Sequence, residues 1–277
     1  MTDPVEAAEL APQLGAAERL SAAARKHAAT VGVAISGSLA AGRGDRYSDL
    51  DLVVVARDAA GVGLLRDAIP AADGVPVARY GGEHVGEPRL VVALYGSLVK
   101  VDFMFLRLDE LAEWNGGRPI RVLWESSRAL TRALGQPVAA TTPREAIEDV
   151  ERRFWTWSWY ALTKVCRGER YEGLSAIGYL RDRALLPMLA LGRGRAPRGP
   201  RRIDELVESS SLPFEQTLAG LDQGDLLRAL RATIALYRRI ADPLLARHGI
   251  APAAAARELV SGAVEQELAL ASERAAA

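Results

Sequence analysis

Two aspartates separated by one residue, Asp49 and Asp51, open the run DLDLVVV, whose apolar and β-branched composition predicts a strand over 49–55. Side chains two residues apart on a strand leave the same face of the sheet, so carboxylates at this spacing repel each other unless a cation lies between them. Carboxylate oxygens, together with the phosphate oxygens of a substrate, are typical ligands of Mg²⁺. The spacing therefore predicts a divalent metal site at the start of this strand.

Two further features would complete such a site. Gly37 and Ser38 form a turn ten residues before Asp49, where glycine permits close backbone approach and the serine hydroxyl and turn N–H groups can hold a phosphate. Asp102 lies later in the chain between apolar neighbours, and it can join the first two acids if its strand pairs beside theirs. Each feature is common alone as a plain turn or edge strand. Together they predict metal ligation by Asp49, Asp51 and Asp102 beside a phosphate-binding turn.

Short strands and one leading helix must position these residues. The predicted elements are a helix over 5–29 and strands over 31–36, 49–55, 89–95 and 98–106. A brief helical turn follows Ser38, and Gly96-Ser97 links the last two strands, where a leading glycine predicts a type II′ turn. These segments predict a small mixed β-sheet that carries both acid-bearing strands.

Beyond Pro143 the chain shows helical periodicity and no strand-like alternation. We expect an α+β fold, with a sheet domain over 1–142, an all-α helical bundle over 143–250 and an Ala-rich helical tail over 251–277. The tail has few large apolar residues, which predicts weak packing. The helices expected in this part are 145–167, 172–191, 203–210, 214–219, 224–247 and 253–274.

Composition limits the possible partners and cofactors. The 277 residues carry no formal net charge, so no global field draws the chain onto nucleic acid or a membrane. One cysteine, Cys166, excludes an internal disulfide framework and a cysteine zinc cluster, and it favours a reducing compartment. We expect neither a signal peptide nor a membrane span, and hence a cytoplasmic protein. The oligomeric state is left open.

The five residues Gly37, Ser38, Asp49, Asp51 and Asp102 resemble the motif of the DNA polymerase β-like nucleotidyltransferase superfamily, over about residues 30 to 106. A helical domain after the catalytic one is similar to antibiotic nucleotidyltransferases that act on aminoglycosides and lincosamides. The resemblance implies an adenylyltransferase-like enzyme with Mg²⁺, generally two ions, and ATP or another NTP as co-substrate. It also implies that Asp49, Asp51 and Asp102 bind metal, that Asp102 is the candidate general base, and that Ser38 holds a β- or γ-phosphate.

Two basic residues near the end of the predicted helix 145–167 extend this interpretation. Lys164 and Arg167 share a helix face, and the resemblance implies that Lys164 contacts the nucleotide phosphates; ordinary capping of a helix end is the alternative. A carboxylate bound to Mg²⁺ has a lowered proton affinity, so another acid could be the base instead of Asp102. The alternatives are Glu83, Glu87, Glu169 and Glu172.

The expected acceptor is a small-molecule hydroxyl, with an aminoglycoside- or lincosamide-type antibiotic favoured by the resemblance. A polycationic acceptor requires an acidic pocket, to which Glu83, Glu87, Asp109, Glu110 and Glu113 are candidates. Two alternatives stay open: a toxin or regulatory nucleotidyltransferase that modifies RNA or protein, and a non-catalytic nucleotide-binding module. The Arg-rich link at Arg193, Arg195, Arg198, Arg201 and Arg202 is the feature that would bind nucleic acid, with a solvated loop as the alternative.

Overall fold

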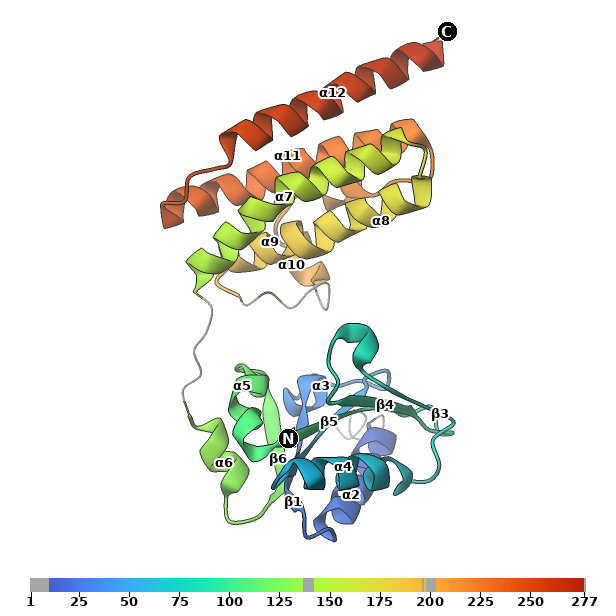
Figure 1. Cartoon of the computed structure of the whole chain (residues 1–277), viewed down its shortest axis with the longest axis vertical. Helices are drawn as coiled ribbons and strands as arrows, with labels where there is room; N and C mark the ends of the chain where they lie inside the picture. The colour runs from blue at the N-terminus through green and yellow to red at the C-terminus, as the bar shows by residue number, and fades with distance from the viewer. Residues whose placement is uncertain (1–9, 137–141, 196, 198–202, 277) are drawn as a thin grey trace. The chain divides into compact units, whose positions relative to one another are not determined.

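In the computed structural model of the chain, which describes residues 10–136, 142–195, 197 and 203–276, packing divides the protein into two compact units. Met1–Ala140 form the sheet unit, and Thr141–Ala277 form the helical unit (Figure 1). Within the described residues, all strands lie in the sheet unit, which confirms the α+β fold class. The limits expected at 142/143 and 250/251 stay predictions.

The sheet unit contains a six-stranded sheet with the strand order β3-β4-β5-β2-β1-β6. The strands are β1 (Thr30–Ser36), β2 (Leu50–Ala56), β3 (Ala78–Gly81), β4 (Leu90–Leu94), β5 (Lys100–Arg107) and β6 (Ile120–Glu125). β2 and β5 pair in parallel, and the other neighbours pair antiparallel, so the sheet is mixed. The strand of Asp102 therefore does pair beside the strand that Asp49 and Asp51 open.

Helices cover both faces of this sheet. They are α2 (Ala11–Arg25), α3 (Gly37–Ala40), α4 (Ala59–Ala68), α5 (Leu111–Asn115) and α6 (Ala129–Leu134), with 3₁₀ turns at Ile69–Ala71, Glu83–Val85 and Leu108–Glu110. α2 and α4 pack on one face, and α5 and α6 pack on the other. β2 is apolar at nearly every position because it is central and covered on both sides.

The two strand faces can be followed residue by residue. Leu52 and Phe103 belong to the core beneath α2 and α4, whereas Val53 and Met104 belong to the core beneath α5 and α6. Because strand side chains alternate, Asp51 has the same facing as Val53, and Asp102 has the same facing as Met104. Both acids therefore lie on the α5–α6 face of the sheet.

The hairpin between β4 and β5 differs from the prediction. The Leu98 amide donates to the Tyr95 carbonyl at 2.9 Å, and Tyr95 and Val99 form the next rung. The left-handed residue is Leu98, with φ of 62°, whereas Gly96 has no positive φ. The type II′ turn is therefore wrong, because that turn requires positive φ at its first central residue; here the left-handed residue follows the turn. The sequence also did not predict β3 and β6.

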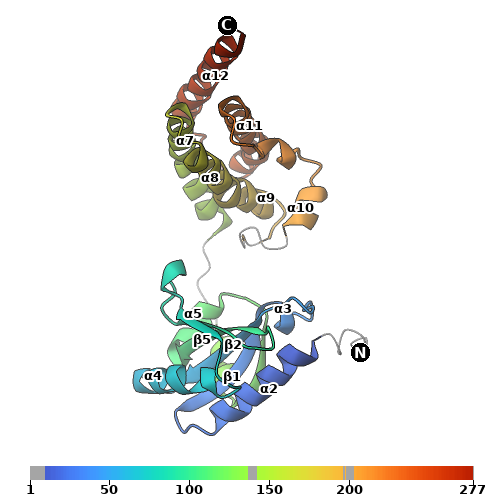
Figure 2. The same ribbon diagram turned by 90° about the vertical axis from the view of Figure 1, so that its right-hand side faces the viewer.

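The helical unit consists of helices linked by short turns. They are α7 (Pro143–Cys166), α8 (Arg170–Leu180), α9 (Leu186–Gly192), α10 (Asp204–Glu208), α11 (Gln223–His248) and α12 (Ala254–Ala276), with a π-helical turn at Arg181–Leu185 and a 3₁₀ turn at Phe214–Thr217. Thr142 and Glu145 form a capping box that starts α7. α7 packs against α8, α11 and α12 (Figure 2).

The last helix, α12, is joined to this unit more firmly than its composition predicts. Val260 and Val264 are buried in the common core. At the start of α12, Arg257 Nε donates to Glu151 Oε1 of α7 at 3.2 Å, and Arg257 also pairs with Asp242 of α11 at 2.6 Å. The expectation of weak packing is therefore wrong. Within the described residues, no helix has the length and apolar content needed to cross a membrane.

Candidate functional site

The Gly-Ser turn begins where β1 ends. Gly37 has φ of 68°, in the left-handed region that favours glycine. A Cβ at Gly37 would also collide with Asp51 Oδ2, so a side chain here would displace that carboxylate. Only glycine meets both requirements. The turn that carries Ser38 and the second aspartate of the D-x-D pair are thus in contact.

The parallel pairing of β2 with β5 places the acids opposite each other. Asp51 is the register partner of Asp102, and Leu50 is the partner of Val101. Asp49 immediately precedes Leu50, and Lys100 immediately precedes Val101. The α5–α6 face is therefore shared by four residues that alternate with core residues of the other face: Asp49, Asp51, Lys100 and Asp102. We call these four residues the acidic quartet.

Lys100 is the cation of the acidic quartet. Its Nζ donates to Asp49 Oδ2 at 2.8 Å and lies 2.6 Å from Asp102 Oδ1. Burial lowers the pKa of Lys100, but hydrogen bonds and charge from Asp102 and Asp49 outweigh it, so the pKa lies above its ordinary value. Lys100 is not among the residues predicted from the sequence, although it lies two positions before Asp102 and shares its face.

One oxygen of the acidic quartet has the Lys100 ammonium as its close partner. Asp102 Oδ1 is buried and lies 2.6 Å from Lys100 Nζ, and no further donor of the described residues reaches it. A buried carboxylate oxygen has lost its hydrogen bonds to water, and here one flexible side chain replaces them. A ligand cation or proton can therefore bind this oxygen when Lys100 moves away.

The predicted ligation of metal ions by Asp49, Asp51 and Asp102 stays a prediction. The three carboxylates share a face, but no three acid, histidine or cysteine side chains of the described residues are grouped to hold an ion. Lys100 bridges Asp49 and Asp102, while Asp51 lies against Gly37. The donor set still fits Mg²⁺, because it consists of carboxylate oxygens.

The loop that leads into Asp49 is held by a buried amide that the sequence analysis did not identify. Gln13 of α2 is 5% exposed, and its Nε2 donates to the carbonyls of Arg46 and Ser48 at 3.1 and 3.3 Å. Within the loop, the Asp45 carboxylate accepts from the Ser48 hydroxyl at 3.1 Å. Gln13 therefore positions the backbone from which Asp49 emerges.

Lys164, the predicted phosphate ligand, lies in a cluster at the junction of α7 and α8. Its Nζ pairs with Glu169 at 2.8 Å and with Glu172 at 3.1 Å, and it lies 5.1 Å from the centre of the Tyr160 ring. The Tyr160 hydroxyl donates to Glu172. Arg167 is more exposed and lies 3.9 Å from Glu169. The cluster unites two predicted cations with two of the alternative bases, and the phosphate-binding role of Lys164 and Arg167 stays a prediction.

The alternative bases differ in their contacts. Glu87 accepts two side-chain hydrogen bonds from Arg89, at 2.7 and 2.8 Å, and these lower its pKa. The pKa of Glu172 is lowered by hydrogen bonds from Tyr160 and Lys164. Glu169 pairs with the same lysine, and Glu83 is exposed. Asp102 likewise pairs with a lysine, at 2.6 Å, so these contacts do not decide between the acids, and Asp102 stays the predicted base.

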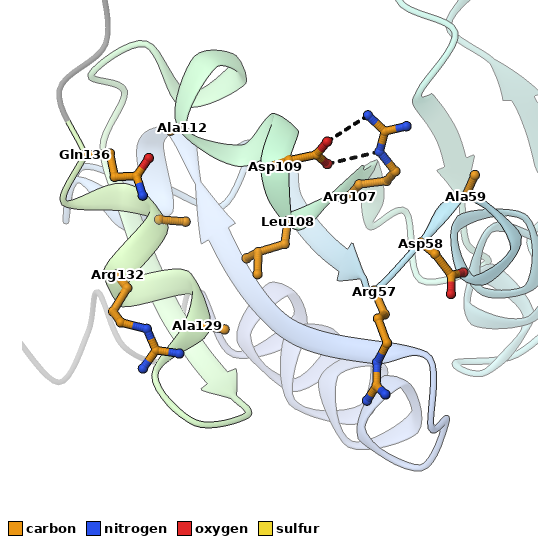
Figure 3. Close-up of a pocket in the computed structure, with 11 residues that line it drawn as sticks. Arg57, Asp58, Ala59, Arg107, Leu108, Asp109, Ala112, Ala129, Arg132 and Gln136 are labelled. Atoms are coloured by element: carbon orange, nitrogen blue, oxygen red, sulfur yellow. Dashed lines mark hydrogen bonds and ion pairs between the residues drawn. The ribbon is translucent and has the colours of Figure 1, made fainter.

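An open hollow of about 780 Å³ lies in the sheet unit, away from the acidic quartet (Figure 3). It is lined by Arg57, Arg107 and Arg132, among others, and Arg57 and Arg107 lie at the carboxyl ends of β2 and β5. The quartet lies at the opposite ends of these strands. Since β5 has eight residues, about 23 Å of strand separates Lys100 from Arg107.

This geometry removes some of the acids predicted for an acceptor pocket. Asp109 lines the hollow and accepts two hydrogen bonds of 3.0 Å from Arg107 (Figure 3). Glu110 accepts from the Arg107 amide at 2.8 Å, and Glu113 follows on α5. All three lie beyond the carboxyl end of β5, whereas Asp102 lies near its start, so they do not adjoin the acidic quartet.

Only part of the Arg-rich link is described. The Arg193 guanidinium donates to the Ser209 carbonyl at 3.4 Å, and Arg195 is exposed. Arg198, Arg201 and Arg202 lie outside the described residues. The nucleic-acid contact that the sequence allowed here stays a prediction.

No protein-family model and no curated protein matches the chain. Among solved structures, it is similar to an aminoglycoside 6-adenyltransferase from Bacillus subtilis, with 14% identity, a TM-score of 0.41, and coverage of 96% of this chain and 98% of that one. A nucleotidyltransferase-like protein from Exiguobacterium sibiricum gives 14% identity, a TM-score of 0.34, and coverage of 87% and 80%. A STING-associated CdnE c-di-GMP synthase from Capnocytophaga granulosa gives 14% identity, a TM-score of 0.31, and coverage of 87% of this chain and 83% of that one.

These neighbours include the class of protein that the motif resemblance names. At such low identity and TM-scores, the likenesses carry no argument about activity or acceptor. The chemistry of this chain is therefore argued from the acidic quartet and the turn at Gly37.

Proposed function

We propose that this chain is a nucleotidyltransferase, which moves a nucleoside monophosphate from an NTP, ATP being favoured, onto a hydroxyl of a small molecule. The observation that carries the proposal is the register of β2 and β5, which aligns Asp51 with Asp102 on one face while Gly37 holds its turn against Asp51. Carboxylates that face one another beside a glycine turn suit a nucleotide's phosphates and their counter-cation.

In the proposed reaction, the acceptor hydroxyl oxygen forms a bond to the α-phosphorus, and its proton passes to the Asp102 carboxylate. The bond from the α-phosphorus to the bridging oxygen breaks, and its electron pair leaves with pyrophosphate. Asp102 can take the proton on its buried Oδ1 once the Lys100 ammonium, which lies 2.6 Å away, has left that oxygen. The products are the nucleotidylated acceptor and pyrophosphate.

Asp49, Asp51 and Asp102 are the residues that would hold Mg²⁺. When bound, the ion neutralises charge on the phosphates and on the leaving pyrophosphate. Ser38 would donate its hydroxyl to a terminal phosphate, and the lack of a side chain at Gly37 lets the backbone approach the same group. Lys164 and Arg167 are proposed to contact the phosphates as well, as the motif resemblance implies.

The acceptor is proposed to be an antibiotic of the aminoglycoside or lincosamide type, on the resemblance of domain organisation alone. Glu87 lies with Glu110 rather than with the acidic quartet, because Arg89 pairs with both, so the acids that would bind the acceptor stay a prediction. Glu87 is already paired with Arg89, so a cationic acceptor would have to compete with that arginine.

The test is a pyrophosphate-release screen of the purified protein with the four NTPs and Mg²⁺ against antibiotics, RNAs and proteins. Release that depends on an antibiotic supports the proposal, whereas release with RNA or protein alone assigns a different acceptor. Asp49→Asn and Asp51→Asn should abolish release while leaving the circular dichroism spectrum unchanged. Full activity in either folded variant, or no release with any combination, would refute the proposed function.

A further inference from the structure

The side chain of Lys100 lies where a ligand cation would be expected to bind. Its Nζ is 2.8 Å from Asp49 Oδ2 and 2.6 Å from Asp102 Oδ1. The two oxygens come from neighbouring parallel strands, and the stem of Lys100 starts from one of these strands, directly beside Asp49 and two positions before Asp102. The ammonium is therefore an internal counter-ion of the acidic quartet.

A divalent ion cannot simply be added to this arrangement. Mg²⁺ binds carboxylate oxygens at about 2.0–2.1 Å. An ion on Asp49 Oδ2 or Asp102 Oδ1 would thus approach the ammonium closely while sharing the same oxygen, and the two cations would repel each other. Binding of the ion therefore requires Lys100 to leave these oxygens.

Lys100 is able to leave without disrupting the fold. Its side chain is 34% exposed, and a lysine has a flexible four-carbon stem. On the face of β5 that carries Lys100, the first core residue is Met104. Val101 and Phe103 point to the other face. Movement of the ammonium breaks its ion pairs with Asp49 and Asp102.

A bound nucleotide would change this balance in two ways. Its phosphate oxygens are an alternative partner for the displaced ammonium, and they complete the coordination of a metal ion that keeps few protein ligands. Metal and nucleotide would then each raise the affinity for the other, because coupling between two binding events is reciprocal.

We propose that Lys100 is a resident competitor for the metal position, so that divalent metal binds the acidic quartet weakly until nucleotide is present. This inference rests on the proposed function for the identity of the nucleotide partner. The competition itself is a property of the free protein. It can therefore be measured without turnover and without any acceptor.

The experiment is a titration of the nucleotide-free full-length protein with Mn²⁺, followed by the electron paramagnetic resonance signal of free Mn²⁺. Lys100→Met removes the competing charge, and we expect Mn²⁺ to bind at least about tenfold more tightly than to the wild type. Lys100→Arg keeps the charge and should bind as weakly as the wild type. Arg57→Met, at the far end of β2, is the matched control and should also match the wild type.

A second variant and a second measurement keep the result interpretable. In Lys100→Met/Asp102→Asn the gain in affinity should disappear, which assigns it to this site. If Lys100→Met is less stable than the wild type, Mn²⁺ should raise its thermal unfolding midpoint more than that of the wild type. Equal or weaker Mn²⁺ binding by Lys100→Met, with no such rise, would overturn the proposal.

The two proposals fail separately. If the pyrophosphate screen yields nothing but Lys100→Met gains Mn²⁺ affinity, the competition stands and the proposed function is wrong. If pyrophosphate is released and Lys100→Met shows no gain, the competition is wrong and the function stands.

Discussion

Two carboxylates with nearby cations, Glu151 in the helical unit and Asp102 in the sheet unit, are satisfied to very different degrees. Glu151 is 3% exposed and joins α7 to α11 and α12. Its donors are Trp155 Nε1 at 3.2 Å, the Tyr237 hydroxyl at 2.7 Å, the Ala253 amide at 3.0 Å and Arg257 Nε at 3.2 Å. Asp102 Oδ1 has the Lys100 ammonium beside it, at 2.6 Å, and no further donor among the described residues.

The difference separates a structural charge from one that is available for chemistry. A buried carboxylate with four donors has replaced its hydrogen bonds to water, and it stabilises the packing of the elements that supply the donors. A carboxylate whose buried oxygen is held by one flexible ammonium retains the capacity to bind a ligand. We infer that Glu151 holds the helical unit together, whereas Asp102 is kept for a ligand.

The largest expected effect is on the stability contributed by Glu151. Glu151→Ala leaves Trp155, Tyr237 and the Ala253 amide without this acceptor and Arg257 with Asp242 alone. We expect a loss of about 3–5 kcal/mol in the free energy of unfolding. Urea unfolding followed by far-ultraviolet circular dichroism measures it. Glu148→Ala, at an exposed position of the same helix, is the control and should leave the unfolding midpoint unchanged.

The next effect concerns Lys164, whose carboxylate partners Glu169 and Glu172 are partly exposed. If this lysine contacts phosphate, Lys164→Met should raise the KM for the nucleotide about tenfold, since a charge-assisted hydrogen bond is lost. Steady-state pyrophosphate release at varied NTP concentration measures it. Arg152→Met, on the exposed side of α7, is the control and should leave the KM unchanged. An equal KM in both variants would show that Lys164 does not contact the nucleotide and only caps the end of the helix.

A smaller effect on stability is expected for Asp102 itself. Asp102→Ala removes one of the two ion pairs of Lys100, which keeps Asp49 as its partner. The free energy of unfolding should therefore change by no more than about 1 kcal/mol, while pyrophosphate release is lost. The same urea experiment measures the first quantity. A loss as large as that of Glu151→Ala would show that both carboxylates are structural and would break the comparison.

The smallest effect is a difference in acid sensitivity. Burial raises the pKa of Glu151, but the hydrogen bonds from Ala253, Tyr237, Arg257 and Trp155 outweigh it, so the folded-state pKa is lowered. A carboxyl group with a lowered folded-state pKa stabilises the protein fully when the pH is above the unfolded-state pKa, which is about 4.3 for Glu. This stabilisation is lost as the pH falls through the folded-state pKa.

The free energies of unfolding of the wild type and Glu151→Gln should therefore differ by a constant amount between about pH 7 and about pH 5, because this range lies above the unfolded-state pKa. The difference should narrow below about pH 4.3. Urea midpoints measured across this range test the sign. A difference that widens on acidification would contradict the lowered pKa.

Much of the sheet unit follows from local spacing. The alternation in DLDLVVV places Asp49 and Asp51 on one face of a strand, and that strand is β2 one residue later than predicted. The need for glycine at 37 follows from the turn that ends β1. The helices α7, α11 and α12 also lie within a few residues of their predicted limits, because periodicity over many turns is a strong signal.

Long-range pairing decided the rest. Lys100 becomes part of the acidic quartet only because β5 pairs in parallel with β2 in one particular register. Glu151 meets Arg257 across 106 positions of chain, and composition around α12 carries no sign of this contact. The short strands β3 and β6 likewise depend on neighbours for their hydrogen bonds.

The physical reason lies in the range of the interactions. Face and periodicity are set by the covalent geometry of a few consecutive residues, so a sequence displays them directly. Register, burial of a charge and the number of its donors depend on segments that meet only when the chain folds. That is why the acids could be named from the sequence, whereas the ammonium that pairs with two of them required the tertiary structure.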